Sequence, residues 1–266
     1  LAAQPLILDG YKEPYKTYNI NTFGTLNLLE ICRKSSFVKS LICITSDKCY
    51  ESNFSTKGFK ENDKLGGIDP YSGSKASAEI IINTYIKSYL KKNSKLGIAS
   101  ARAGNVIGGG DQSPNRLIPD LVNSLNKNKK IILRNPHFNR PWQHVLEPLF
   151  GYLILGIGLF KYPQKYSSAW NFGTEKNTVT SVLSIVKFAI NRWGNGKLRV
   201  KRNKKIYEQT NLQLNIEKSK RILKWKPKFS IKESVNITID WYRKVLKKEK
   251  TPEQITENQI KAYMRY

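Results

Sequence analysis

Ser46, Asp47 and Lys48 place a hydroxyl, an acid and a base side by side, directly after the apolar run 41–44. Such a run is typical of a buried strand, so these polar side chains stand where the strand is expected to reach water. A carboxyl group and an amine in adjacent positions could act together as general acid and base. A polar loop at a strand end is the alternative interpretation, and the rest of the sequence has to decide between the two.

Tyr71 and Lys75 form a second pair that could do chemistry. Residues four apart lie on one face of a helix, one turn from each other. A lysine ammonium close to a phenol stabilises the phenolate and lowers the pKa of the tyrosine, which can then act as a base near neutral pH. Many helices contain such a pair by chance. The pair gains weight because Asp47, at the end of a predicted strand, lies 24 residues before Tyr71.

Alternating strands and helices would position these residues. Asp69 and Pro70 are typical of a helix start, because aspartate can cap the first turn and proline suits the first helical position. The helix that follows is expected to end near Leu90, and the buried strands are expected at 38–45 and 96–103. The sequence also predicts a short strand at 131–133 and helices at 17–34, 117–126, 145–160, 180–193, 216–224 and 231–248. This alternation predicts an α/β fold with a mostly parallel sheet.

The composition narrows the class of protein. The 266 residues carry 46 Lys and Arg against 20 Asp and Glu, which gives a net charge of +26. A strongly basic chain suggests nucleic-acid binding, but the lysines are scattered and no aromatic signature of RNA binding accompanies them. We therefore expect no nucleic-acid partner, and a general attraction for anionic ligands such as sugar nucleotides. No apolar run reaches the roughly 20 residues that a membrane helix needs, so we expect no membrane partner.

The first residues and the cysteines indicate a cytoplasmic protein. Residues 1–5 have neither a basic leader nor a long apolar segment, so we expect no secretory signal. Cys32, Cys43 and Cys49 match no metal-binding spacing, and their odd number argues against a disulfide framework. We interpret them as small core residues in a reducing compartment, and we expect no metal site.

The strand-end hydroxyl and the Tyr71–Lys75 pair together resemble the active site of the short-chain dehydrogenase/reductase superfamily, in its extended branch of NAD-dependent epimerases and dehydratases. The resemblance implies that Lys75 also holds the nicotinamide ribose of NAD, beside Tyr71. Residues 1–4, LAAQ, resemble the segment that follows the fourth strand in this family. Ala2 and Ala3 are therefore expected to line the cofactor.

Four further segments resemble one branch of the superfamily, the sugar-nucleotide 4,6-dehydratases: TSDK (45–48), SARAGNVIGGGD (100–111), RNPHFNRPWQHVLEPL (134–149) and AWNFG (169–173). Within AWNFG, WNFG resembles a late element of the substrate lobe. Lys48 stands where the branches that act on dTDP- and GDP-sugars carry glutamate, and lysine is typical of the branch that acts on CDP-glucose. The resemblance therefore implies conversion of CDP-glucose to CDP-4-keto-6-deoxyglucose, in the biosynthesis of deoxysugars and surface polysaccharides, lipopolysaccharide included.

The same resemblance implies roles for the catalytic residues. Tyr71 would take the proton from the hydroxyl on carbon 4 of the sugar while hydride passes to NAD. Lys48 would assist loss of the proton on carbon 5, Asp47 would protonate the departing hydroxyl on carbon 6, and Ser46 would hydrogen-bond the reacting oxygen. The adjacent acid and base would serve this elimination, which needs both at once. The sugar nucleotide is expected to contact four residues, of which the guanidinium of Arg140 best suits a diphosphate: Asn105, Arg116, Arg140 and His144.

The superfamily's cofactor fingerprint, a Gly-rich turn after the first strand that opens a helix, has no match in that context. We therefore expect a truncated Rossmann-type doubly wound parallel sheet with a smaller C-terminal substrate lobe, inactive as an isolated chain. Residues 1–135 would form the C-terminal part of the NAD-binding domain, interleaved with the lobe. Residues 136–248 would form mainly the substrate-binding lobe, and 249–266 a charged, frayed tail.

The strand at 38–45 would then be an exposed apolar edge, which tends to pair with another chain. We expect an N-terminal fragment chain as a possible partner, and a homo-oligomer for the complete protein. Two alternatives for the function stay open. One is another NAD-dependent sugar-nucleotide dehydratase or epimerase, and the other is a non-catalytic remnant that binds a sugar nucleotide or a partner chain.

Overall fold

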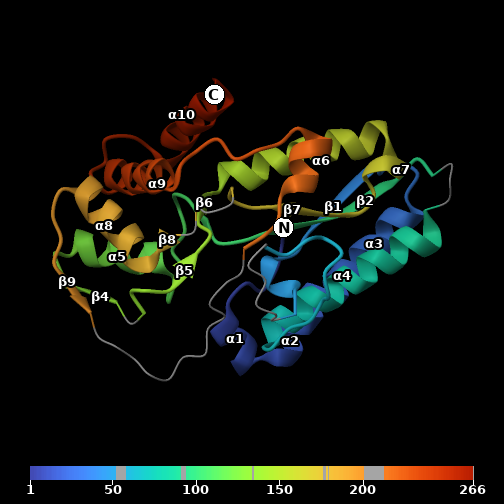
Figure 1. Ribbon diagram of the computed structural model, residues 1–266, viewed down its shortest axis with the longest axis horizontal. Helices are drawn as coiled ribbons and strands as arrows, with labels where there is room; N and C mark the ends of the chain where they lie inside the picture. The colour runs from blue at the N-terminus through green and yellow to red at the C-terminus, as the bar shows by residue number, and fades with distance from the viewer. Residues whose placement is uncertain are drawn as a thin grey trace. The chain divides into compact units, whose positions relative to one another are not determined.

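The computed structural model describes residues 1–51, 58–90, 94–133, 135–175, 178, 180–200 and 213–265 (Figure 1). The chain divides into two compact units, and each unit is built from three separate segments. The first unit consists of Leu1–Gly104, Pro148–Gly173 and Leu212–Lys226, and the second of Asn105–Glu147, Thr174–Asn211 and Pro227–Tyr266.

These segments differ from the boundaries expected from the sequence, 1–135 and 136–248. Residues 105–135 fold with the second unit, whereas 148–173 fold with the first. The physical reason is strand β7 (Ala169–Phe172), which pairs with the main sheet of the first unit. The AWNFG segment is therefore a sheet element, and its expected place in the substrate lobe is wrong.

A parallel three-stranded sheet lies at the centre of the first unit, in the order β1 (Ser40–Ile44), β2 (Gly97–Ala103), β7. This confirms the expected α/β class with a parallel sheet. Of the two predicted strands, β1 is shorter than expected at both ends and β2 begins one residue later. Six of the seven residues of β2, from Gly97 to Arg102, are buried. Burial on both faces is typical of a strand in a parallel sheet that helices cover on either side.

The helical elements of the first unit are α1 (Ile7–Lys12), α2 (Pro14–Tyr18), the π-helical turn η1 (Asn19–Phe23), α3 (Gly24–Lys34), the 3-10 turn η2 (Asp47–Cys49), α4 (Pro70–Tyr89), α6 (Leu146–Lys161), α7 (Pro163–Tyr166) and the π-helical turn η3 (Ser219–Leu223). Elements α2, η1 and α3 follow one another without a break, so the helix predicted at 17–34 begins earlier and contains a π turn. The helix predicted at 216–224 is observed as η3.

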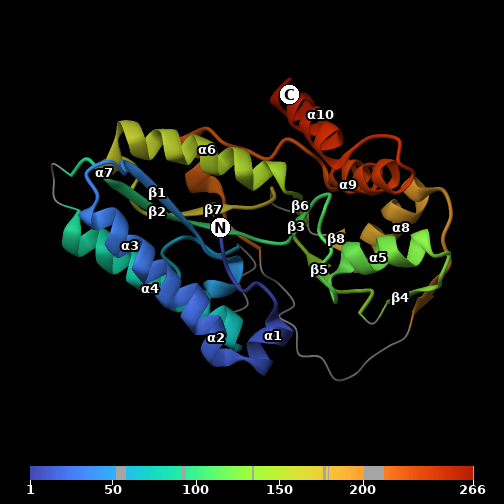
Figure 2. The same cartoon turned by 180° about the vertical axis from the view of Figure 1, so that it is seen from behind.

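Helices cover both faces of the sheet (Figures 1 and 2). Helices α3 and α4 lie side by side on one face, where Leu41 and Cys43 of β1 belong to their apolar cluster. Helix α6 covers the opposite face, where Ile42 and Ile44 pack into the cluster that contains Leu155 of α6. Successive side chains of β1 thus enter two different apolar layers, which is why this strand reads as a continuous apolar run.

The described residues of the second unit contain three pairs of short strands and four complete helices. The parallel pairs are β3 (Val106–Ile107) with β6 (Gln143–His144) and β4 (Ile131–Leu133) with β9 (Leu198–Val200), and the antiparallel pair is β5 (Asn139–Arg140) with β8 (Thr180–Ser181). Its complete helices are α5 (Leu117–Asn126), α8 (Val182–Trp193), α9 (Ile231–Leu246) and α10 (Pro252–Arg265). In the described ranges of both units, every helix is too short or too polar to cross a membrane.

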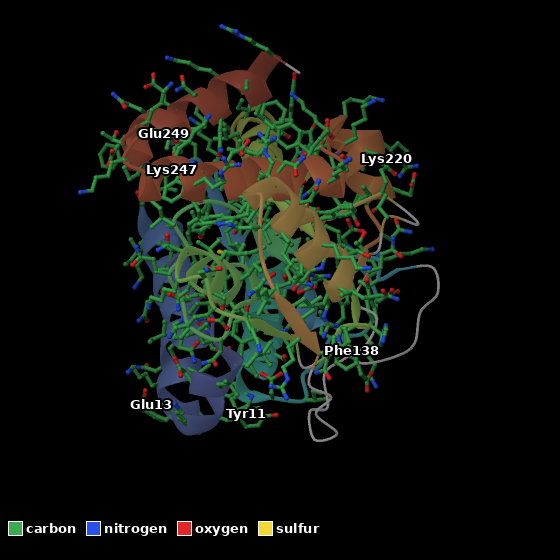
Figure 3. The ribbon with its side chains drawn as sticks, turned by 90° about the vertical axis from the view of Figure 1, so that its left-hand side faces the viewer. Tyr11, Glu13, Phe138, Lys220, Lys247 and Glu249 are labelled. Carbon is green, nitrogen blue, oxygen red and sulfur yellow. The ribbon has the colours of Figure 1, made fainter. Side chains whose placement is uncertain are left out.

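Helix α10 corrects the expected frayed tail at 249–266. After the connection that contains Lys247 and Glu249 (Figure 3), the chain forms a helix that buries Ile255 and Tyr263. The hydroxyl of Tyr263 donates to Oε2 of the buried Glu147 at 2.7 Å. The tail is ordered because a few apolar and aromatic side chains anchor an otherwise polar helix.

Candidate active site

The segment that follows β1 places Ser46 and Asp47 in the interior of the first unit, at 6% and 4% exposure. Ser46 caps the turn η2, because its Oγ accepts the backbone N–H of Lys48 at 3.2 Å. The same hydroxyl donates to Oδ1 of Asp47 at 3.0 Å. Lys48 is half-buried. The hydroxyl and the acid are therefore held together at the carboxyl end of β1, as the sequence predicts, but they are buried and do not face water as expected.

Helix α4 begins as its cap predicts. Oδ1 of Asp69 accepts the backbone N–H of Ser72 at 3.0 Å, and Pro70 occupies the first helical position. This start places the half-buried Tyr71 in the first turn and Lys75 one turn later.

Lys75 brings helix α4 to the strand end. Its Nζ donates to the carbonyl oxygen of Ile44, the last residue of β1, at 3.1 Å. The side chain is buried, and burial lowers the pKa of the Lys75 ammonium because the charged form loses water. Residues 46–48 and the helix that carries Tyr71 and Lys75 thus meet at the carboxyl ends of the parallel strands. Open α/β sheets bind their ligands just outside this end of the strands.

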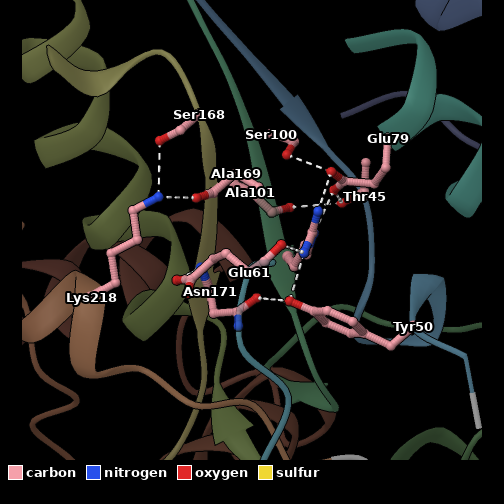
Figure 4. A network of polar contacts seen from close by, with 11 residues as sticks. Thr45, Tyr50, Glu61, Glu79, Ser100, Ala101, Ser168, Ala169, Asn171 and Lys218 are labelled. Atoms are coloured by element: carbon pink, nitrogen blue, oxygen red, sulfur yellow. Dashed lines mark hydrogen bonds and ion pairs between the residues drawn. The ribbon is translucent and has the colours of Figure 1, made fainter. Parts of the chain in front are cut away.

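A buried ion pair lies directly beneath this strand end (Figure 4). Glu79 of α4 and Arg102 of β2 are 2% and 3% exposed, and Arg102 Nη2 lies 2.6 Å from Glu79 Oε2. Arg102 Nε also donates to Glu79 Oε1 at 2.8 Å, so the pair is bidentate. No motif in the sequence pointed to Glu79 or Arg102. An arginine inside a strand of small buried residues was the available signal, because a buried guanidinium needs an acidic partner.

The expected substrate contacts all lie in the second unit. Asn105 is half-buried, and its carbonyl oxygen accepts the backbone N–H of Gln143 at 3.0 Å. Arg116 precedes α5 and pairs with Asp111 at 3.3 Å. The guanidinium of Arg140 lies over the ring of Phe138, 5.9 Å from its centroid.

His144 has a different environment from these residues, because it is 1% exposed. Its Nδ1 accepts the backbone N–H of Leu146 at 3.3 Å, and its ring meets Phe229 edge-on at 5.8 Å between centroids. Burial lowers the pKa of His144 to about 4. The imidazole is therefore neutral at pH 7 and packed in the interior of its unit.

The other sequence expectations concern the N-terminus and the cysteines. Ala2 is exposed and Ala3 half-buried, in the segment before α1. Cys32, Cys43 and Cys49 are buried free thiols, as expected of core residues. Burial raises the pKa of Cys43 to about 12. Across the ranges that the structure describes, no three His, Cys, Asp or Glu side chains are grouped as a metal site requires.

Comparison with known proteins gives a consistent set of relatives. The family model of GDP-mannose 4,6 dehydratase matches residues 1–238. CDP-glucose 4,6-dehydratase of Salmonella typhimurium is 38% identical over 248 residues, which cover 91% of this chain and 69% of that relative.

Solved structures agree on the fold. The crystal structure of dTDP-glucose 4,6-dehydratase from Bacillus anthracis in complex with NAD is 27% identical, with a TM-score of 0.75, and the match covers 92% of this chain and 71% of that one. UDP-glucose 4-epimerase from Thermotoga maritima, solved with UDP-glucose, has a TM-score of 0.78 at 23% identity, over 92% of this chain and 76% of that one. At that identity the epimerase supports the Rossmann-type fold alone.

Proposed function

The chain belongs to the GDP-mannose 4,6 dehydratase family, and on this premise we propose that it is an NAD-dependent sugar-nucleotide 4,6-dehydratase that acts on CDP-glucose. The product would be CDP-4-keto-6-deoxyglucose. The observation that carries the proposal is the hydrogen bond from Lys75 to Ile44, which brings the helix of Tyr71 to the strand end that holds Asp47. The lysine at position 48 and the likeness to the Salmonella enzyme support CDP-glucose as the substrate.

Tyr71 would accept the proton of the hydroxyl on carbon 4. A phenol does this near neutral pH only if its anion is stabilised, and the ammonium of Lys75, one helical turn away, supplies positive charge. Burial lowers the pKa of Lys75, and a phenolate nearby would favour its charged form.

Asp47 would protonate the hydroxyl that leaves carbon 6, and Lys48 would assist removal of the proton from carbon 5. Asp47 is suited to this role because it is buried at the strand end, where the neighbouring hydroxyl of Ser46 fixes its orientation at 3.0 Å. Adjacent positions in η2 keep the acid and the base within reach of neighbouring carbon atoms of one sugar.

The residues at this strand end suit the nicotinamide end of NAD, which supplies the chemistry of taking up a hydride from carbon 4 and returning it at carbon 6. A lysine ammonium has three N–H donors. Within the described part of the chain, Lys75 gives one of them to Ile44, which leaves donors for the hydroxyls of a ribose. We propose that Tyr71 and Lys75 hold this end, with Ala2 and Ala3 beside it.

We propose that Arg140, Arg116 and Asn105 contact the diphosphate and nucleoside. Arg140 is the strongest of these candidates, because a guanidinium can bind a diphosphate through two parallel hydrogen bonds. His144 would support this site through packing, because its ring is buried and neutral.

Incubation of the full-length protein with CDP-glucose and NAD tests the reaction. The expected product has lost one water and carries a keto group at carbon 4, without net consumption of NAD. Tyr71→Phe should slow the initial oxidation by about 10²–10⁴-fold, whereas Asp47→Asn should slow elimination more than oxidation. Tyr162→Phe, at an exposed position of the same unit, is the control and should keep wild-type rates. An epimer without a keto product, or wild-type elimination by Asp47→Asn, would refute the assignment.

We also propose that strand β1 pairs with a further parallel strand from an N-terminal segment of the full-length protein or from a separate fragment chain. Among the described residues β1 pairs only with β2. Beside its other edge, an apolar groove is lined by β1 and α6, and Leu153, Ile157 and Phe160 of α6 are 57–65% exposed. The lengths of the relatives support an additional segment, since the chain spans 69% of the Salmonella enzyme.

Co-expression with such a segment tests this pairing. NAD binding measured by calorimetry and a single peak in size-exclusion chromatography should be gained together, because the same strands would complete the sheet and bring the phosphate-binding turn. Ile157→Glu should abolish both gains, and Ile132→Glu, equally exposed in the second unit, should not. Tight NAD binding by the 266-residue chain alone would contradict the proposal.

For the complete protein we propose a homo-oligomer in the cytoplasm that serves deoxysugar synthesis for surface polysaccharide, including lipopolysaccharide. Three buried free thiols support a reducing compartment. Exposed apolar side chains on α3 and its preceding turn, among them Phe23 and Ile31 at 54% and 64%, support contact with a second copy. Sedimentation of the complete protein as a monomer at micromolar concentration would contradict the oligomer.

A further inference from the structure

Glu79 shares one face of helix α4 with the two proposed catalytic residues. Tyr71, Lys75 and Glu79 follow one another at intervals of four, so they lie in successive turns of the same helix. Lys75 reaches the end of β1, while Glu79 faces the interior of the first unit at 2% exposure. The position of Glu79 therefore determines where the other two residues lie relative to the sheet.

The carboxylate of Glu79 is bound by two side chains of strand β2 and by one from the short segment between β1 and η2. Its Oε1 accepts from the hydroxyl of Thr45 and from Arg102 Nε, the latter at 2.8 Å. Its Oε2 accepts from Ser100 Oγ at 2.7 Å and from Arg102 Nη2 at 2.6 Å (Figure 4). Each oxygen thus has two donors, which leaves the helix little freedom to rotate or slide on the sheet.

Arg102 also contacts Tyr50, the residue that follows the segment 46–49 with the proposed catalytic side chains. Its Nη1 donates to the hydroxyl of Tyr50 at 2.6 Å and to the carbonyl oxygen of Glu61 at 2.9 Å. The hydroxyl of Tyr50 in turn donates to Oδ1 of Asn171 at 2.8 Å. Thr45 precedes Ser46, and Tyr50 follows Cys49, so the ion pair holds both ends of the segment 46–49.

We propose that Glu79 and Arg102 are positioning residues for the dehydration, which lock the helix carrying Tyr71 and Lys75 to the segment 46–49. This proposal rests on the proposed function. A buried ion pair is a poor source of stability, because the desolvation of both charges offsets their attraction. The pair instead fixes the positions of these elements, because one carboxylate and one guanidinium connect α4, β2 and both ends of the turn that carries Asp47 and Lys48.

Cysteine labelling measures this locking without any enzymatic activity. Cys49 lies within the segment and is 0% exposed, so it reacts with iodoacetamide only when the segment opens. Cys32 of α3, at 4% exposure, reports on the rest of the same unit. In the folded 266-residue chain, Glu79→Gln should raise the labelling rate of Cys49 about tenfold or more relative to Cys32, since the bonds lost are charge-assisted. The rates are measured separately for each cysteine by peptide mass spectrometry.

Asp240→Asn is the matched control, because Asp240 forms a bidentate pair with Arg192 on the surface of the second unit. It should change neither labelling rate. Equal acceleration at Cys49 and Cys32 in Glu79→Gln would mean a general loss of stability, and no acceleration would mean that the segment is held by other contacts. Either result would overturn the positioning role.

Kinetics of the full-length protein provide the second readout. Glu79→Gln should lower kcat by about 10- to 100-fold, the effect expected of a small misplacement of reacting groups. The KM for CDP-glucose should change little, because the pair is buried beneath the site. Thr45→Ser, which keeps the hydroxyl bound to Glu79, should retain activity, and Thr45→Val should lose it. Unchanged kcat in both Glu79→Gln and Thr45→Val would refute positioning. Failure of the wild type to convert CDP-glucose would refute the proposed function, and the labelling result would still decide the role of the pair.

Discussion

The buried neutral state of His144 predicts a specific loss of stability in mild acid. The ring is 1% exposed, its Nδ1 accepts a backbone N–H, and burial lowers its pKa from an ordinary 6.5 to about 4. The unfolded chain therefore binds a proton at His144 between pH 6.5 and 4, while the folded chain does not. Protonation in this window favours the unfolded state, so the stability that the neutral ring contributes is complete above pH 6.5 and is lost as the pH falls toward 4.

The size of this effect follows from the pKa difference. A shift of one unit corresponds to about 1.4 kcal/mol, so the fall from 6.5 to about 4 gives a contribution of about 3 kcal/mol between the two ends of the window. This is a substantial fraction of the roughly 5–15 kcal/mol by which folded domains are stable. The chain has two histidines, so few other groups change charge across the upper part of this range.

Urea denaturation at several pH values, followed by tryptophan fluorescence, measures the effect. The free energy of unfolding should fall from pH 6.5 to pH 4, and His144→Asn should flatten this dependence, since the amide oxygen can replace Nδ1 as acceptor and carries no titrating group. The exposed His137→Gln is the control and should leave the slope unchanged. Direct titration of the two imidazole signals by NMR gives the pKa itself. A His144 signal that titrates near 6.5, or an unaltered slope in His144→Asn, would refute the reasoning.

Two further changes test the packing. Gly151→Ala should destabilise the protein by about 1–3 kcal/mol in thermal unfolding, because its new Cβ would lie 2.4 Å from Phe172. Gly156→Ala in the same helix is the control and should be neutral or stabilising, because the nearest atom to its new Cβ is 3.6 Å away. Equal melting temperatures for the two variants would contradict the packing argument. Tyr263→Phe should cost about 1–3 kcal/mol, because it removes a donor from the buried carboxylate of Glu147. Limited proteolysis should then release α10 faster, and unchanged cleavage would show that the hydroxyl does not anchor this helix.

Elements with local signals could be predicted well from the sequence. Asp69 caps α4 and Pro70 begins it, because capping depends on residues within one turn of each other. The bounds of α5 and β4 also agree with the prediction, Leu117–Asn126 and Ile131–Leu133. Residues 46–48 and the pair Tyr71 and Lys75 could be assigned to one site because both resemble the active site of the same family. In the structure, Lys75 makes the contact between the strand end and helix α4.

Contacts between distant segments had no comparable signal. Glu79 and Arg102 are 23 residues apart, and only the packing of α4 on β2 pairs them. Helix α10 has few apolar positions, and its anchor Tyr263 finds Glu147 at a separation of 116 residues. A polar helix that is anchored by two buried side chains and one distant carboxylate looks like a charged tail when its residues are read in order.

The interleaving of the two units has a consequence for synthesis of the protein on the ribosome. The sheet of the first unit receives its third strand only at residues 169–172, and the last segment of that unit ends at Lys226. The emerging chain therefore cannot complete its first unit until most of the second has also been made, so folding of both units is delayed together. A premature stop codon between β2 and β7 would leave a chain in which residues 100–103 of β2 lack the strand beside them, and such products should depend on chaperones or be degraded.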